Sequence, residues 1–311
     1  MSGPAVVALG GGHGLSASLS ALRLVSDAIT AVVTVADNGG SSGRLREEFG
    51  VLPPGDLRMA LSALCDDTEW GHQWRDVLQH RFSGNGPLGG HALGNLLIAA
   101  LWDLNPDPVH GLELVGRLLN AHGRVLPMAA VPLEITAQVD HDGASGPVTV
   151  VGQHQVALSG GQVRSIALHP TDPPANAQAV AAVRAAGWVV LGPGSWFTSV
   201  LPHLLVPGLR DALVDTSARR ILTLNLEMHT QETRGFSAQR HLESLQEHAP
   251  QLRLDVVLAD PSIVEDELAL RSAAAAVGAE LVIAPVGTSR QPGAHDPLRL
   301  AAAYRDIMRP W

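Results

Sequence analysis

The feature that most constrains this chain is an apolar strand that runs directly into a loop of glycine and serine. Residues 29–35 form a β-branched apolar run, typical of a strand covered on both faces of a parallel sheet. The loop consists of Asp37, Asn38, Gly39, Gly40, Ser41, Ser42 and Gly43 and is followed by Arg44. Glycines let the backbone turn through positive φ, and successive N–H groups in such a turn bind an anion. The pattern predicts a phosphate-binding loop.

A similar junction lies near the start of the chain. Residues 5–9 predict another buried strand, which leads through a glycine-rich turn into a helix. The turn and the first helical residues are Gly11, Gly12, His13, Gly14 and Leu15. With Ala17 they match the Gly-x-Gly-x-x-Ala pattern of dinucleotide-binding folds, and Asp37 stands near the expected ribose-binding acid. The alternative, that the glycines only form a tight turn, stays open.

Two polar pairs follow downstream. Asp56 is either the N-cap of a helix over 55–64 or a carboxylate that faces the ligand cleft, with Arg58 close behind. In a helix predicted over 91–104, His91 and Asn95 either meet solvent or line the cleft. The opposite, buried face of that helix is predicted to carry Leu93, Leu96, Leu97, Ala100 and Leu101.

Between residues 131 and 170 the apolar pattern changes to alternation. It predicts three antiparallel strands, over 134–140, 148–158 and 162–169, inserted into an α/β chain. A strand over 188–191 then ends in a second phosphate-type loop with Gly194 and Ser195, and Thr198 opens the next helix. Asn225 lies in the strand predicted over 221–226. Ser195 lacks the Gly-x-Ser-x-Gly elbow of a serine hydrolase.

Further strands over 254–258 and 281–284 bring the parallel sheet to six. Helices are predicted over 237–248, 265–277 and 297–308. We therefore expect an α/β fold, a Rossmann-like, doubly wound and mostly parallel six-stranded sheet with a small antiparallel β insertion.

The amino-acid composition argues against several classes of function and of binding site. The net charge of −9 argues against broad nucleic-acid binding. All 21 basic residues are Arg, so a Walker A lysine is absent and a phosphate clamp must use Arg, backbone N–H groups or hydroxyls. Cys65 is the single cysteine, which excludes an internal disulfide and a cysteine zinc site. No signal-like segment and no run of about 18 apolar residues is evident, so we expect a soluble cytoplasmic protein without membrane insertion.

Four loops in this order resemble the gluconeogenesis factor family (YvcK), a branch of the CofD-like superfamily, and most of all its mycobacterial and other actinobacterial members. These loops are residues 10–15, residues 37–46, residues 53–58 and residues 192–199. The resemblance extends over nearly the whole chain, including 90–96 and 295–297. It implies one domain over 1–311 with the β insertion at about 131–170.

The resemblance also implies a function. The implied function is that of a regulator that binds a UDP-sugar, either UDP-N-acetylglucosamine or UDP-glucose. The resemblance implies that this regulator is needed for cell shape, for the supply of cell-wall precursors and for growth on gluconeogenic carbon sources. No catalytic residue is assigned and no cofactor is required, although Mg²⁺ could accompany the ligand. The alternative is a phosphotransferase like the enzymatic relatives, which move a 2-phospholactyl group from a nucleotide diphosphate to the deazaflavin Fo, with Asp37 holding Mg²⁺. Whether the protein binds cell-wall or regulatory protein partners, and whether it forms a homodimer, stays open.

In the regulator hypothesis the N–H groups of 11–15 and 39–43 hold the diphosphate, with Arg44 as counter-charge. Ser195 and Thr198 bond phosphate or sugar hydroxyls, while Asp37 and Asn225 orient the nucleoside or sugar. Three departures from the family stand out. Asn38 replaces an expected second Asp, which weakens a site of paired carboxylates; His13 replaces a Thr; and residues 228–233 lack an expected Pro-Gly.

Overall fold

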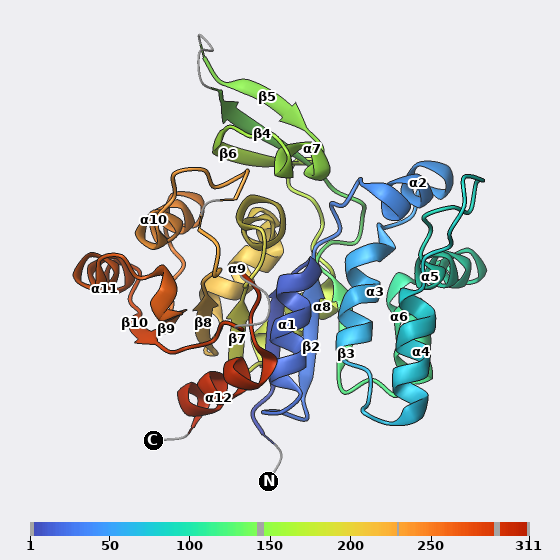
Figure 1. Ribbon diagram of the computed structural model, residues 1–311, viewed down its shortest axis with the longest axis horizontal. Helices are drawn as coiled ribbons and strands as arrows, with labels where there is room; N and C mark the ends of the chain where they lie inside the picture. The colour runs from blue at the N-terminus through green and yellow to red at the C-terminus, as the bar shows by residue number, and fades with distance from the viewer. Residues whose placement is uncertain (1–2, 142–145, 229, 289–292, 310–311) are drawn as a thin grey trace.

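A parallel sheet of seven strands forms the centre of the computed structural model, which describes residues 3–141, 146–228, 230–288 and 293–309 (Figure 1). The strands are β1 (Val6–Gly10), β2 (Ile29–Val33), β3 (Arg124–Pro127), β7 (Trp188–Leu191), β8 (Arg219–Thr223), β9 (Val256–Ala259) and β10 (Glu280–Ile283). Their order is β10-β9-β8-β7-β1-β2-β3. From β1 the chain adds β2 and β3 on one side, and later adds β7 to β10 on the other side, so the strand order reverses between β1 and β7. The expected doubly wound α/β architecture is thus confirmed.

Helices cover both faces of this sheet, with α1, α3 and α12 in front of it in Figure 1 and α8 and α9 behind it. The helices are α1 (Gly12–Leu22), α2 (Gly40–Phe49), α3 (Pro54–Ala63), α4 (Glu69–Gln79), α5 (Leu93–Leu104), α6 (Pro108–Leu118), α8 (Ala177–Ala185), α9 (Pro207–Asp215), α10 (Ala238–His248), α11 (Glu267–Ala276) and α12 (Pro297–Met308). Shorter turns are the π-helical η1 (Trp196–Val200) and the 3₁₀ turns η2 (Leu201–Leu205) and η3 (Pro261–Ile263). Every residue of β1, β7 and β9 is buried, which explains their unbroken apolar sequences.

The expected number of six strands is wrong because β3 was missed. This edge strand has four residues, begins with the exposed Arg124 and ends with Pro127. It pairs only with β2, so a proline that cannot donate to a neighbour is tolerated there. A strand this short and interrupted gives no periodic signal.

The β insertion is a separate three-stranded antiparallel sheet, at the top of Figure 1. It consists of β4 (Glu134–Asp140), β5 (Val148–Val151) and β6 (Gln162–His169), with β4 in the middle. The strand expected over 148–158 stops early, because the chain turns at Gly152 (φ 98°) into the short helix α7 (Gln153–Ala157). That helix packs over the β2–α2 loop, and its residue His154 donates a backbone hydrogen bond to Asn38.

The helix α5 is oriented differently from the prediction. Its buried residues are Gly94, Asn95, Ile98, Ala99 and Trp102. The four leucines expected inside are partly exposed, and Ala100 is exposed. Asn95 is inside because Arg58 of α3 is also inside and bonds to it, so a polar pair replaces the expected apolar contact.

The last helix is tied to the centre through the only tyrosine of the chain, Tyr304. Its buried hydroxyl lies 2.9 Å from the hydroxyls of Ser18 and Thr223. Ser18 donates its proton to the carbonyl oxygen of Gly192 at 2.9 Å. Since each hydroxyl carries one proton, the chain of donation runs from Thr223 through Tyr304 and Ser18 to Gly192.

Within the described ranges, no helix is both long and apolar enough to cross a lipid bilayer.

We expect Tyr304→Phe to lower the free energy of unfolding by about 1–2 kcal/mol, because it leaves two buried hydroxyls short of a partner without opening a large cavity. Urea denaturation measures this change. Leu298→Ala, at an exposed position of the same helix, is the control and should change the midpoint little. Equal midpoints for Tyr304→Phe and wild type would contradict the hydroxyl chain.

Candidate functional site

The loops after β1, β2 and β7 meet at the carboxyl edge of the sheet, where the strand order reverses. Their approach depends on glycine. A Cβ atom on Gly14 would collide with the carbonyl of Pro193, and one on Gly11 would lie 2.5 Å from both Asp56 Oδ2 and Thr34 Cγ2. This is the position where doubly wound folds bind nucleotides.

Two helices begin at this edge without a side-chain cap. The N-cap residues of α1 and α2 are Gly11 and Gly39, and neither makes a side-chain capping bond. The next residues, Gly12 (φ 57°) and Gly40 (φ 46°), adopt left-handed backbone conformations that favour glycine. The N-terminal amides and the positive ends of both helix dipoles therefore face the edge, which favours an anion. His13 is exposed, and Leu15 is in the core.

Two carboxylates stand between these helix ends. Asp37 accepts a hydrogen bond from Gly39 N at 2.8 Å. Asp56 is not the N-cap of α3, which is Pro53, but lies in its first turn. Burial and then the charge of Asp37 raise the pKa of Asp56 to about 7, against the opposing effects of the Gly12 backbone hydrogen bond and the charge of Arg58. Asp56 thus titrates near neutrality and can hold or release a proton there.

The carboxylate beside Asp37 is Asp56 and not the residue at position 38. Asn38 is turned toward α7, where its amide donates to Gln155 Oε1 at 2.9 Å and accepts from His154 N at 3.0 Å. Among the described residues no group of three or more His, Cys, Asp or Glu side chains could hold a metal ion. Mg²⁺ commonly uses one or two carboxylates together with ligand phosphates, and Asp37 with Asp56 fits only that mode.

A buried polar chain supports the second loop. Arg58 Nε donates to Asn95 Oδ1 at 2.8 Å, and Asn95 Nδ2 donates to Ser41 Oγ at 3.0 Å. Ser41 Oγ lies 3.0 Å from His91 Nδ1. Burial and then the charge of Arg81 lower the pKa of Arg58 to about 10, while Asp56 opposes this. His91 and Asn95 are therefore buried supports of the loop, and neither meets solvent freely.

The rest of the second loop borders a pocket of about 690 Å³. Its cationic lining residues are Arg44, Arg46 and Arg81. Arg44 is exposed and donates to the carbonyl oxygens of Pro87 at 3.2 Å and Gly89 at 2.8 Å, which aims its guanidinium along the pocket rim. Gly40, Ser41 and Gly43 line the same pocket. Ser42 is buried and accepts from Gly55 N at 3.0 Å, so it joins the loop to α3.

The third loop is held by side chains behind it. Asn225 accepts from Gly194 N and donates to Gly194 O, both at 2.8 Å, so both the oxygen and the nitrogen of its amide fix the loop. Ser195 is exposed at the edge. Thr198 is buried and donates to Glu232 Oε2 at 3.2 Å.

Sequence reasoning missed Glu232, which lies in the segment 228–233 whose residue His229 is outside the described residues. Glu232 is buried and also accepts from the backbone N–H of Phe197 at 3.4 Å. Burial raises its pKa to about 7, although Thr198 and the η1 backbone oppose the shift. A carboxylate three residues before the solvent-exposed Gly235 gives no signal of burial in the sequence.

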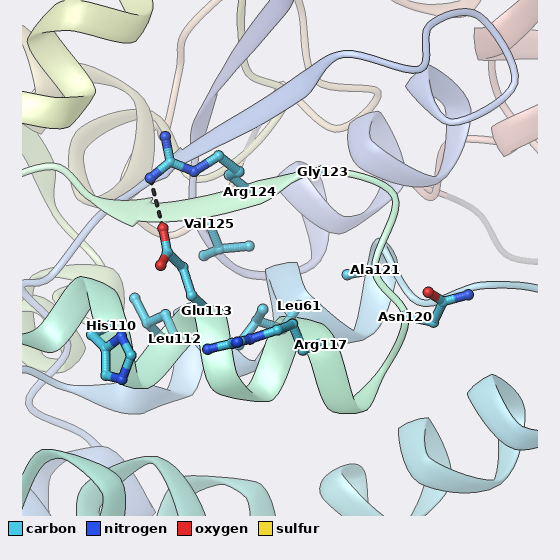
Figure 2. Close-up of a pocket in the computed structure, with 11 residues that line it drawn as sticks. Leu61, His110, Leu112, Glu113, Arg117, Asn120, Ala121, Gly123, Arg124 and Val125 are labelled. Atoms are coloured by element: carbon cyan, nitrogen blue, oxygen red, sulfur yellow. Dashed lines mark hydrogen bonds and ion pairs between the residues drawn. The ribbon is translucent and has the colours of Figure 1, made fainter.

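A second hollow, of about 560 Å³, is shown in Figure 2 between α6 and the start of β3. There Arg124 pairs with Glu113 at 2.8 Å and bonds Gln178 at 2.6 Å. Arg124 is the first residue of β3, so this hollow lies at the amino edge of the sheet. Parallel α/β sheets bind their ligands at the other edge, which makes this hollow the weaker candidate.

Known proteins resemble the whole chain. The sequence profile of the family described as 2-phospho-L-lactate transferase CofD matches residues 6–294. A Mycobacterium tuberculosis protein named putative gluconeogenesis factor is 52% identical over 307 residues, 97% of this chain and 90% of that protein. The gluconeogenesis factor of Bacillus subtilis is 35% identical over 85% of this chain and 81% of its own length. The crystal structure of a UPF0052 family protein from Bacillus halodurans has a TM-score of 0.87 at 32% identity, covering 97% of this chain and 99% of that one.

Glu232→Gln should change how stability depends on pH. The folded state holds the Glu232 proton with a pKa of about 7 against an ordinary 4.5. This contribution to stability is therefore fully present below about pH 4.5 and is lost as the pH rises through about 7. Between pH 4.5 and 8, the free energy of unfolding of Glu232→Gln should therefore fall less than that of wild type, by up to roughly 3 kcal/mol.

Urea denaturation of both proteins at pH 4.5, 6 and 8 measures the difference. Glu243→Gln, at an exposed glutamate of α10, is the matched control. If Glu232→Gln and wild type show parallel pH profiles, the buried carboxylate does not titrate in this range.

Proposed function

The chain belongs to the gluconeogenesis factor branch of the CofD family, and on this premise we propose that it is a regulator that binds a UDP-sugar at the carboxyl edge of its parallel sheet. The observation that carries the proposal is the pair of uncapped, glycine-initiated helices that point at one edge. A diphosphate carries the charge and the acceptor oxygens that two such helix ends can bind. UDP-N-acetylglucosamine and UDP-glucose are the proposed ligands.

In this proposal the diphosphate lies between the N-termini of α1 and α2. The exposed Arg44 supplies the counter-charge from the pocket rim, and its guanidinium is already oriented by two carbonyls. Asp37 accepts a hydroxyl of the ribose or sugar. Ser195 is exposed and can reach a ligand directly, whereas Thr198 and Asn225 act by fixing the third loop.

The cellular role follows from the same premise. The related proteins are named gluconeogenesis factors. We infer that UDP-sugar occupancy is the quantity this protein senses, linking growth on gluconeogenic carbon to cell-wall precursor supply and cell shape. A regulator of this kind needs only that its bound and free states differ in affinity for a partner.

The pair of Asp37 and Asp56 favours a second candidate, a phosphotransferase of the 2-phospholactyl type. Mg²⁺ bound there with a nucleotide diphosphate would neutralise charge on the transferring phosphoryl group. Asp56 titrates near neutrality and could take the proton of an acceptor hydroxyl. Formation of product from a 2-phospholactyl nucleotide donor, Fo and Mg²⁺ would establish the transferase, and loss of that product in Asp56→Asn would assign the role.

Arg44→Ala should weaken UDP-N-acetylglucosamine binding by about 1.5–3 kcal/mol, the range for a hydrogen bond to a charged group. Isothermal titration calorimetry measures this affinity. Arg117→Ala is the control, since it removes an exposed arginine from the hollow of Figure 2. Loss of affinity in Arg117→Ala with none in Arg44→Ala would move the site to the amino edge.

A thermal-shift series separates the ligand classes. UDP-N-acetylglucosamine, UDP-glucose, UDP, NAD and GDP are each tested with and without Mg²⁺. A ligand at about 100 times its Kd adds roughly 2.7 kcal/mol, which raises Tm by about 4 °C for a chain of this size. We expect shifts with the UDP-sugars and none with NAD. A shift with NAD alone would favour the dinucleotide-binding alternative of the first loop.

A further inference from the structure

A groove of about 540 Å³ leads away from the carboxyl edge between α1, α3 and α4. It begins at His13, next to the first loop, and continues along the side of α1 to Arg23. Arg81 also lines the pocket that borders Arg44, whereas the other residues of the groove do not. The function proposed above makes no use of it.

The groove is strongly cationic. Four of its lining residues are arginines, namely Arg23, Arg58, Arg75 and Arg81, and none of the residues that line it is acidic. Like charges this close are unfavourable unless something compensates them, and Arg81 indeed lowers the pKa of Arg58. The sequence has an overall charge of −9, so this concentration of positive charge is local.

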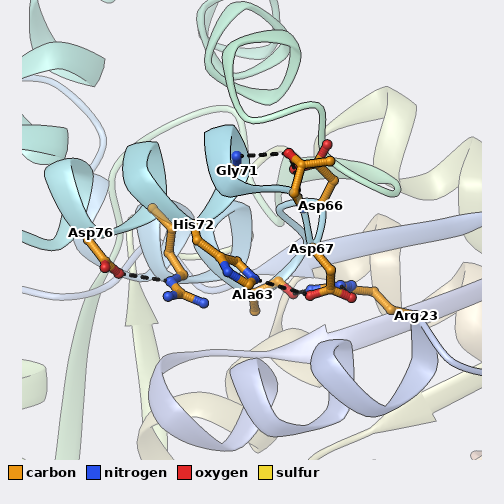
Figure 3. Close-up of polar contacts among 9 residues, drawn as sticks. Arg23, Ala63, Asp66, Asp67, Gly71, His72 and Asp76 are labelled. Atoms are coloured by element: carbon orange, nitrogen blue, oxygen red, sulfur yellow. Dashed lines mark hydrogen bonds and ion pairs between the residues drawn. The ribbon is translucent and has the colours of Figure 1, made fainter.

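Acidic neighbours compensate part of this charge: Asp56 acts on Arg58, and two further aspartates pair with arginines at the outer end of the groove. Figure 3 shows Arg23, the residue after α1, reaching Asp67, which His72 also approaches. Asp76 of α4 forms a further ion pair, with Arg75. The distances are 2.5 Å for Arg23 to Asp67 and 3.0 Å for Arg75 to Asp76. Both aspartates are largely exposed, so these pairs are screened by solvent and contribute little.

Three buried polar atoms of residues that line the groove have no hydrogen-bond partner among the described residues. They are Arg58 Nη1, Arg23 Nε and Ser62 Oγ. Arg58 and Ser62 are each only 3% exposed. An unsatisfied buried donor costs about 1–3 kcal/mol, so three in one groove call for a ligand that accepts them.

We propose that this groove is a second anion site, which binds the phosphate group of a small organic phosphate independently of the UDP-sugar. A phosphate offers three terminal oxygens, enough for the Arg58 guanidinium, the Ser62 hydroxyl and a third donor from Arg23, whereas a carboxylate offers two. Arg75 at the mouth supplies charge that attracts the anion. The site would let a second metabolite act on the protein beside the first loop.

The test is calorimetric titration of the whole chain with inorganic phosphate at low ionic strength. Ser62→Ala removes a buried donor and Arg75→Ala removes charge at the mouth, and each should weaken binding roughly tenfold. Arg210→Ala is the matched control: Arg210 likewise pairs with the aspartate next to it, at 3.3 Å, and is exposed to a similar degree. Arg44→Ala reports on the other pocket. Arg210→Ala should leave phosphate affinity within about twofold of wild type.

Two results would overturn the proposal. One is wild-type protein that binds no phosphate, which would mean that water satisfies the groove. The other is an affinity that falls in Arg44→Ala and stays unchanged in Ser62→Ala and Arg75→Ala, which would place the anion at the glycine loops. Ser62 and Arg75 line the groove and not the pocket that borders Arg44, so the titrations of Ser62→Ala and Arg75→Ala test the groove separately from the proposed function. Circular dichroism confirms that each variant is folded.

Discussion

The structure depends on the close backbone contact between the start of α1 and the loop after β7. Gly14 leaves no room for a side chain beside Pro193, and Gly11 leaves none between Asp56 and Thr34. Only because these atoms are missing can the first loop, the third loop and α3 converge at the point where the strand order reverses. Every group assigned to the ligand site takes its position from that convergence. The glycines thus determine both the packing and the accessibility of the helix ends.

Arg58 connects the two cationic regions. Its Nε belongs to the buried chain that reaches the second loop through Asn95, and its Nη1 faces the groove between α1, α3 and α4. A charge buried in this way is costly unless it is paired on all sides. Here the Nε of Arg58 is paired with the side-chain amide of Asn95, whereas its Nη1 has no hydrogen-bond partner among the described residues.

The sequence alone predicted the parts of the fold that have local causes. Unbroken apolar runs predicted β1, β2 and β7, and the helix predicted over 297–308 has the observed bounds of α12, Pro297–Met308. The errors have tertiary causes. β3 is short and lies at an edge, α7 forms where the chain turns over Asn38, and α5 is rotated because Arg58 requires Asn95. Glu232 belongs to the same class, since only the approach of η1 buries it.

The hydroxyl chain that ends at Gly192 has a consequence for the order in which the protein is completed. The proton direction at Ser18 is set by Tyr304, which lies close to the end of the sequence, whereas the loops of the ligand site lie in its first two thirds. A nascent chain emerging from the ribosome can pair β1 with β2 and β7 and can form α1. It lacks the hydroxyl that orients Ser18 toward the third loop until α12 has been synthesised. The hydrogen bond from Ser18 to the third loop is therefore completed by its supporting hydroxyl only after α12 has been added.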